Sequence, residues 1–241
     1  GGKDSWSLLS LLRAYERRVP FEFSYFAVTL DQGQPGFAPE ILETYYTEHR
    51  YRFHIEYRDT YSVVVDNTPA GKAYCALCSR MRRGILYRIA AEQGATKIAL
   101  GHHREDFIET LLMNQFYAGR IRSMAPLLRE SNGGATLIRP LVFAPESELI
   151  TYAAEEGFPI IPCNLCGSQD NLKREEIREL LSQLEKVNPR IRGNLLAALG
   201  NIDPGHLLLD RSADDPPDQG DPTETLVTIT PSQADLAIPD R

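Results

Sequence analysis

The sequence lacks the features of a membrane protein and of a disulfide-rich secreted protein. None of its apolar runs reaches the 18 residues expected of a membrane-spanning helix, and its start lacks the basic and then apolar segments of a signal peptide. Cysteine is scarce, with four among 241 residues. So few cysteines argue against a disulfide-stapled domain and favour a reducing cytoplasm with a metal or cluster site.

Acidic residues outnumber basic ones, but the excess lies at one end of the chain. The net charge is −7, and residues 202–241 alone hold nine acidic and two basic residues, so residues 1–201 are neutral overall. Residues 72–139 hold eleven Lys and Arg against five Asp and Glu. A basic middle is typical of proteins with a phosphate-rich partner, although a solvated helix face would look the same. The segment 202–241 is acidic, Pro-rich and without periodicity, so we expect a disordered tail after one domain over 1–201.

Apolar periodicity predicts an α/β protein. Strands alternating with helices indicate a parallel sheet with helices on both faces. The expected helices cover 4–18, 39–50, 78–92, 106–116, 145–156, 171–187 and 190–199. The expected strands cover 21–30, 61–65 and 97–100.

The chain opens on Gly1-Gly2-Lys3-Asp4-Ser5, which leads directly into the first predicted helix. Glycines allow the backbone to approach phosphate, and a helix start offers N–H groups and the positive end of a dipole. This loop is not a Walker A motif, and it resembles the S-G-G-x-D-S signature of PP-loop ATP pyrophosphatases. A chance glycine turn is the simpler alternative. Asp31, at the end of the following strand, favours the nucleotide site because such folds bind ligands at the carboxyl edge of the sheet.

The four cysteines form two C-x-x-C pairs, Cys75 with Cys78 and Cys163 with Cys166. Two such pairs could hold tetrahedral zinc, an iron–sulfur cluster or a redox dithiol, and the spacing does not choose among these. Unpaired core cysteines are the simplest alternative, but two C-x-x-C pairs and no other cysteine argue against it.

Longer stretches resemble the tRNA-cytidine(32) 2-sulfurtransferase family, the TtcA enzymes, over essentially residues 1–200. Besides the opening loop, the matching segments are Leu30–Phe37 (LDQGQPGF), Tyr74–Tyr87 (YCALCSRMRRGILY), Gly101–Thr110 (GHHREDFIET) and Ile160–Gln169 (IIPCNLCGSQ). The resemblance implies a Rossmann-like fold of the adenine nucleotide alpha hydrolase-like type. It also implies a strand before Gly1 that this chain does not contain.

The resemblance further implies an ATP- and Mg²⁺-dependent enzyme that thiolates cytidine 32 of tRNA. The C2 carbonyl is adenylated, and sulfur from a cysteine desulfurase then displaces AMP. A [4Fe-4S] cluster would be held by Cys75, Cys78 and Cys163, with Cys166 as a spare, catalytic thiol. Expected partners are tRNA, the desulfurase and, as an option, a second copy of the chain, with no membrane partner and a cytoplasmic location.

By motif position, the resemblance assigns ATP binding to eight residues and catalysis to Asp4, Asp106 and Cys166. The eight ATP-binding residues are Gly1, Gly2, Lys3, Asp4, Ser5, Asp31, Gly101 and His102. His103 is expected near ATP as well, although hydrogen bonding within the fold explains a histidine pair equally well. Simple capping of a helix would explain Asp106. The family usually reads G-H-H-x-D-D here, so Glu105 departs from it and puts the metal geometry in doubt.

Arginines gather near the first cysteine pair and in the basic middle: Arg80, Arg82, Arg83, Arg88, Arg120, Arg122 and Arg129. Some are expected to contact tRNA phosphates, while solvent exposure is the simpler account of any single one. Two other functions fit the same residues. One is a PP-loop thiolase acting on a tRNA uridine, and the other is a non-catalytic, zinc-stapled RNA-binding module.

Overall fold

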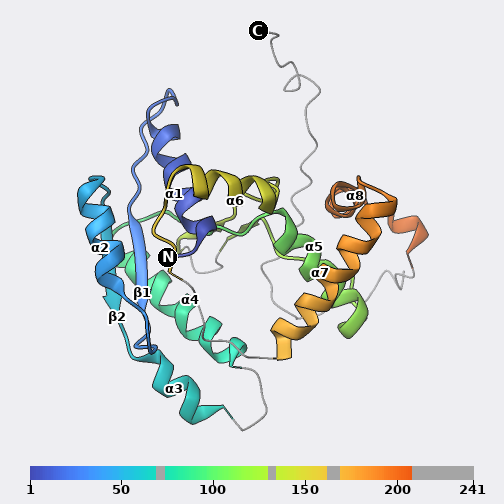
Figure 1. Ribbon diagram of the computed structural model, residues 1–241, viewed down its shortest axis with the longest axis horizontal. Coiled ribbons are helices and arrows are strands. Elements are labelled where there is room, and N and C mark those ends of the chain that lie inside the picture. The colour runs from blue at the N-terminus through green and yellow to red at the C-terminus, as the bar shows by residue number, and fades with distance from the viewer. Residues whose placement is uncertain (69–73, 130–133, 162–168, 208–241) are drawn as a thin grey trace, which may run out of the picture.

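The computed structural model describes residues 1–68, 74–129, 134–161 and 169–207 (Figure 1). Within them the strands are β1 (Ala27–Asp31), β2 (Phe53–Tyr57), β3 (Lys97–Ala99), β4 (Leu127–Leu128) and β5 (Thr136–Ile138). The helices are α1 (Lys3–Glu16), α2 (Pro39–Glu48), α3 (Thr60–Asn67), α4 (Cys75–Glu92), α5 (Arg104–Ala118), α6 (Glu146–Glu155), α7 (Gln169–Val187) and α8 (Ile191–Ala198), followed by a 3₁₀ turn over Pro204–His206.

The described strands form two small sheets. In the first sheet β1 and β2 are parallel, with Ala27 opposite Phe53. In the second, β5 lies between β3, which is parallel to it, and β4, which is antiparallel. The fold is therefore α/β, as the alternation of strands and helices predicts, with parallel pairing in both sheets.

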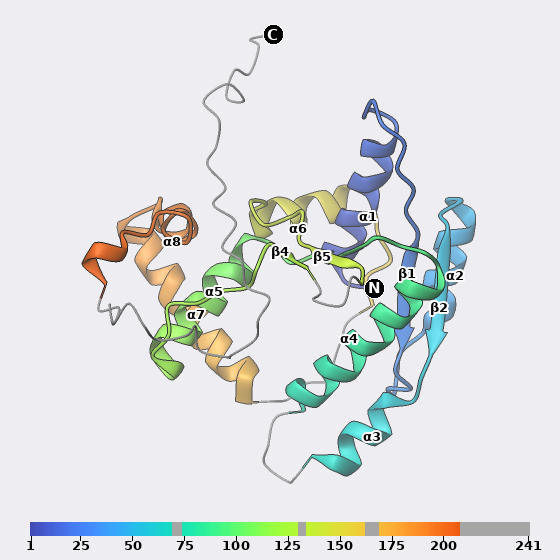
Figure 2. The ribbon, with the colours of Figure 1, turned by 180° about the vertical axis from the view of Figure 1, so that it is seen from behind.

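Helix α1 packs against both sheets through neighbouring buried residues. Trp6 and Leu9 belong to an aromatic cluster with Leu42 and Tyr46 of α2, against which Phe53 of β2 packs. The neighbouring Leu8 packs instead with Leu141 and Leu149, and Ala99 of β3 lies against that second cluster. Helix α6 lies beside α1 in both views (Figures 1 and 2). The start of α1 is thereby fixed relative to the carboxyl ends of β1 and β3.

Two strand predictions are wrong in informative ways. The run Tyr61–Val65 is rich in β-branched residues, yet it lies in helix α3, where the Asp59 side chain accepts a hydrogen bond of 3.0 Å from the Ser62 N–H and caps the first turn. The segment Phe53–Tyr57, which we did not assign to any element, is β2. The strand expected from residue 21 begins only at Ala27.

The helix predictions are confirmed in existence and approximate position, apart from the missed α3. Helix α4 begins at Cys75 and α5 at Arg104, earlier than expected in both cases. Strands β4 and β5 were not predicted. The predicted disorder concerns mainly residues 208–241, which lie outside the described residues. Among the helices that are described, none has the length and apolar character needed to cross a membrane.

Candidate active site

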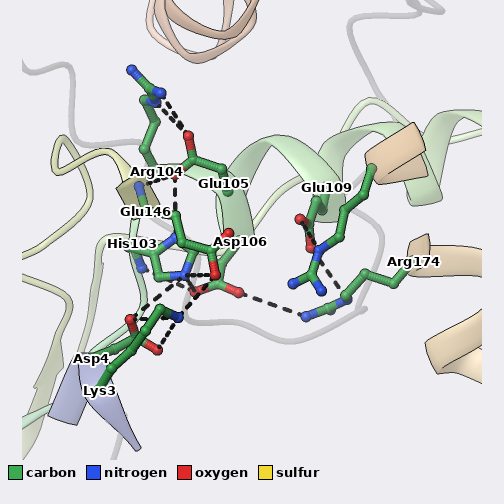
Figure 3. Close-up of polar contacts among 10 residues, drawn as sticks. Lys3, Asp4, His103, Arg104, Glu105, Asp106, Glu109, Glu146 and Arg174 are labelled. Atoms are coloured by element: carbon green, nitrogen blue, oxygen red, sulfur yellow. Dashed lines mark hydrogen bonds and ion pairs between the residues drawn. The ribbon is translucent and has the colours of Figure 1, made fainter. Parts of the chain in front are cut away.

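The N-termini of helices α1, α5 and α6 meet at one place, where they bring together polar side chains from distant parts of the chain (Figure 3). Lys3 and Asp4 come from α1, His103 and Asp106 from the start of α5, and Glu146 from the start of α6. Helix N-termini carry the positive ends of the helix dipoles and their unsatisfied N–H groups. The arrangement therefore suits negative charge, either of carboxylates or of a bound phosphate.

Lys3 is the cation of the opening loop, and two carboxylates hold it. Its Nζ lies 2.9 Å from Glu146 Oε1 and 3.1 Å from Asp4 Oδ1. Burial alone would lower the pKa of Lys3, but the hydrogen bonds and charges of Glu146 and Asp4 outweigh burial and raise that pKa. Lys3 is thus held as a cation at the start of α1.

His103 lies at the centre of the cluster with only 3% of its surface exposed. Its Nε2 lies 3.9 Å from Asp4 Oδ1, 3.6 Å from Asp106 Oδ2 and 3.7 Å from Glu146 Oε1. Its burial opposes protonation, but Glu105 and these three carboxylates dominate, so the pKa of His103 is raised. The surrounding carboxylates thus favour the protonated form of the His103 ring.

Glu105 does not point toward the lysine and the phosphate loop. Its Oε2 accepts a hydrogen bond of 2.7 Å from the backbone N–H of Glu146 and lies 3.4 Å from Nδ1 of His103. Its Oε1 accepts two bonds from the Arg104 guanidinium. These partners overcome the effect of burial and lower the pKa of Glu105 to about 2. The side chain of Glu105, one methylene longer than Asp, therefore places its carboxylate where it caps α6 and contacts His103.

Asp106 faces the other way and belongs to the cluster. Its Oδ2 accepts a hydrogen bond of 3.0 Å from the His103 backbone N–H, as a capping carboxylate does. Its Oδ1 lies 3.7 Å from Nη1 of Arg174 on α7. Asp106 therefore both caps the start of α5 and lies in the cluster around His103.

Arg174 is held near the site by a buried acid that we did not predict. Glu109 on α5 is 1% exposed, and its Oε2 lies 3.6 Å from Nε of Arg174. Its Oε1 accepts a hydrogen bond of 2.7 Å from Nε of Arg178. Burial raises the pKa of Glu109 although both arginines oppose the rise. The pair places a cation from α7 beside Asp106.

Gly101 brings the end of β3 against the phosphate loop. A Cβ at this position would lie 2.9 Å from the backbone C and O of Asp4 and 3.0 Å from N of Ser5. Only a glycine allows this approach without moving the loop. Gly101 therefore lies directly against the opening loop, and its role in binding ATP stays a prediction.

His102 follows Gly101 and contacts Arg139. Its Nδ1 lies 3.3 Å from Nε of Arg139, the residue after β5. Burial and the charge of Arg139 lower the pKa of His102. Positive charge therefore predominates around His102 and negative charge around His103.

The end of β1 carries a second group of polar contacts that reaches the cysteine helix. Asp31 accepts a hydrogen bond of 2.9 Å from the Gly33 N–H and so closes its own turn. Gln32 Oε1 accepts from Cys78 Sγ at 3.3 Å and from Thr60 Oγ1 at 3.2 Å. Within the described part of the chain, Asp31 bonds to Gly33 and Arg58 and not to the cluster around His103. Its contact with ATP stays a prediction.

The site holds the right donor chemistry for two metal groups, but it is not a preformed cage. Carboxylates are ligands that Mg²⁺ prefers, and thiolates hold iron–sulfur clusters. Within the part of the chain that the structure describes, no group of three or more His, Cys, Asp or Glu side chains is arranged so that it could hold a metal ion. Cys78 is half-buried, the side chain of Cys75 is not described, and Cys163 and Cys166 lie outside the described residues.

Comparison with known proteins assigns the family. The PP-loop domain family matches residues 1–185. The tRNA-cytidine(32) 2-sulfurtransferase of Coxiella burnetii is 52% identical over 208 residues, which cover 86% of this chain and 81% of that protein. The chain belongs to the tRNA-cytidine(32) 2-sulfurtransferase family of PP-loop proteins.

A second curated relative and a solved structure support this family membership. The 2-sulfurtransferase of Bordetella pertussis is 53% identical over 208 residues, and the chain spans about 65% of its length. A solved structure of the U34-tRNA thiolase NcsA from Methanococcus maripaludis, with its [4Fe-4S] cluster, has a TM-score of 0.66 at 22% identity. The match covers 84% of this chain and 70% of that one. The resemblance to the 2-sulfurtransferase family and the Rossmann-like fold are thus both confirmed.

Within this 2-sulfurtransferase family member, the candidate arginines differ in their surroundings. Arg88 is engaged, since it binds Glu56 at 2.5 Å and Glu92 at 2.8 Å. The other six are exposed. Sequence reasoning missed Glu146, Arg139 and Arg174. Glu146 stands next to Pro145 at a helix start, a signal that indicates an N-terminus but no site.

Proposed function

We propose that this protein thiolates cytidine 32 of tRNA at C2 in an ATP-dependent reaction. The observation that carries the proposal is the convergence of three helix N-termini on the loop Gly1–Ser5, in a chain of the 2-sulfurtransferase family. The names of relatives at 51–53% identity support cytidine rather than uridine as the base. Because the carbonyl oxygen of cytosine is a poor leaving group, it must first be converted into a phosphate ester.

In the first step the C2 carbonyl oxygen attacks the α-phosphorus of ATP, and pyrophosphate leaves. The backbone N–H groups of Gly1, Gly2 and Ser5 would bind the phosphates at the start of α1, with Lys3 turning from Glu146 toward the leaving oxygens. The close approach of Gly101 fixes the loop. In the second step sulfur attacks C2, and AMP departs with the original oxygen.

Mg²⁺ would be held by Asp4 and Asp106 together with phosphate oxygens of ATP. Mg²⁺ commonly uses one or two carboxylates and the substrate's phosphates, so a closed protein cage is not needed. Asp4 Oδ1 is buried and accepts no hydrogen bond, although Lys3 Nζ lies 3.1 Å away, so it would bind Mg²⁺ once Lys3 turns toward the leaving oxygens. The cation would neutralise charge on the departing pyrophosphate.

A [4Fe-4S] cluster would be held by Cys75, Cys78 and Cys163, and Cys166 would remain as a catalytic thiol. Cys78 supports this assignment, because its Sγ lies at the carboxyl edge of the first sheet, 3.3 Å from Gln32 Oε1. The cluster would supply an iron that can hold sulfide and lower its proton affinity.

The remaining parts of the proposal concern partners and organisation. A cysteine desulfurase would supply sulfur, the protein would act in the cytoplasm, and two copies could associate. Residues 1–201 would form the catalytic domain and 202–241 an acidic tail. Exposed arginines on α4, such as Arg82 and Arg83, would contact tRNA phosphates. Neutralising both should then weaken tRNA binding and reduce its dependence on salt.

Anaerobic purification tests the cofactor part. We expect a brown full-length protein with about four iron and four sulfide, reduced in Cys75→Ala, Cys78→Ala and Cys163→Ala and retained in Cys166→Ala. A colourless protein that binds zinc would contradict the cluster and favour a zinc-stapled RNA-binding module.

A further inference from the structure

His102 and Arg139 meet because the strands that precede them pair in parallel. β3 and β5 align Ile98 with Leu137, so residues just beyond their carboxyl ends lie side by side. Nε of Arg139 lies 3.3 Å from Nδ1 of His102. A guanidinium N–H can only donate, so Nδ1 accepts. A neutral imidazole that accepts at Nδ1 carries its proton at Nε2.

Arg139 is itself fixed at both ends. Its backbone N–H donates to the carbonyl of Pro126 at 2.9 Å, and its Nη1 donates to the carbonyl of Ala125. The guanidinium therefore reaches His102 from a rigid position between β4 and β5. The guanidinium of Arg139 is half-buried and donates a hydrogen bond to Nδ1 of His102.

The surroundings of His102 favour the neutral ring. Besides burial, three arginines oppose protonation: Arg139, Arg82 from α4 and Arg174 from α7. Asp106 of α5 favours the cation, but burial and these arginines outweigh it, and the pKa of His102 is lowered. The adjacent His103 has the opposite environment, with four carboxylates nearby.

We propose that Arg139 is a positioning residue that holds His102 as the neutral Nε2–H tautomer, and that this N–H donates a hydrogen bond to a phosphate oxygen of the bound nucleotide. The identity of that ligand rests on the proposed function, whereas the tautomer does not. A neutral donor keeps its proton across the pH range in which an ordinary imidazole changes charge. The two histidines would then have different roles, since His103 offsets the charge of the carboxylates and His102 donates a hydrogen bond to the nucleotide.

Nitrogen-15 NMR of the nucleotide-free full-length protein tests the tautomer at pH 7.5. We expect His102 to show an unprotonated Nδ1 and a protonated Nε2, with the signal assigned by its loss in His102→Gln. Arg139→Met should convert it to a mixture of tautomers. Arg18→Met, which removes an exposed arginine elsewhere, should leave it unchanged. A cationic ring or an Nδ1–H tautomer in the unaltered protein would overturn the proposal, as would an unchanged signal in Arg139→Met.

Equilibrium binding of ATP tests the donor. Losing one hydrogen bond should weaken ATP binding by about threefold to tenfold in Arg139→Met and in His102→Ala. His102→Gln, which retains an N–H donor, should bind more tightly than His102→Ala. Unchanged binding in both Arg139→Met and His102→Ala would overturn the donor role. If Arg139→Met fails to fold, Arg139→Lys gives the same NMR test with the charge retained. Because the NMR uses neither ATP nor tRNA, it succeeds or fails independently of the thiolation reaction.

Discussion

Neighbouring carboxylates in this site have different tasks. Asp106 contacts Nε2 of His103, whereas Glu105 turns to the start of α6 and to Nδ1 of His103. The longer side chain is what allows Glu105 to reach the Glu146 N–H. Glu105, which departs from the family pattern, therefore supports the start of α6 and His103, while Asp106 keeps its place in the cluster.

The depressed pKa of Glu105 predicts a specific loss of stability in acid. Its pKa is about 2 in the folded protein and near 4.5 when unfolded, so its contribution is present above pH 4.5 and is lost as the pH falls toward 2. That contribution is as much as about 3 kcal/mol. In urea unfolding, Glu105→Gln should be less stable at pH 7 and should lose less stability between pH 4.5 and pH 3. The exposed Glu148→Gln on α6 is the matched control and should follow the unaltered protein.

Gly101 predicts a steric effect on the phosphate loop. A methyl group there would meet the backbone of Asp4 at 2.9 Å, so Gly101→Ala should cost about 1–3 kcal/mol and weaken ATP binding. Gly84→Ala on α4 meets no atom within 4 Å and should instead stabilise the protein by about 0.5–1 kcal/mol. Thermal unfolding and ATP titration of both variants check this, and a harmless Gly101→Ala would refute the close approach.

At the scale of elements, α2 shows how burial rather than helix position controls stability. Leu42 is 0% exposed in the cluster with Trp6, while its neighbour Ile41 is 48% exposed. Leu42→Ala should therefore cost about 2–5 kcal/mol, and Ile41→Ala about 0.5 kcal/mol or less. Denaturant unfolding compares the two, and equal losses would contradict this description of the core.

The elements also show where sequence reasoning stops. Long helices such as α5 and α7 were predictable because their apolar spacing extends over several turns. Strand β5 has three residues, too few for a periodic signal, whereas the equally short β3 is predicted from its apolar run within residues 97–100. The YSVVV run became helix α3 because the cap at Asp59 and burial of Thr60 and Val64 outweigh strand propensity.

The same limit explains which site residues were found. Gly1–Ser5 and Gly101–Asp106 follow local motifs, so they could be predicted to lie at one edge. The packing of α6, β5 and α7 brings in three further residues: Glu146, Arg139 and Arg174. No local sequence pattern predicts that packing. Their discovery required the three-dimensional arrangement.

For the molecule as a whole, charge and architecture agree with a reaction on RNA. The described elements place the basic helix α4 and the arginines of α7 around the edge where α1, α5 and α6 begin (Figures 1 and 2). The acidic excess is confined to residues 202–241. A phosphate-rich substrate would thus approach the site from its basic surroundings.

The modified base formed in tRNA tests the central claim most directly. The full-length protein is to be expressed in a bacterial strain that lacks its own cytidine 32 thiolase, and the tRNA nucleosides are to be measured by mass spectrometry. We predict that 2-thiocytidine is restored by the unaltered protein and is lost with Lys3→Met or Cys78→Ala. Absence of 2-thiocytidine with the unaltered protein, or a thiouridine in its place, would contradict the account.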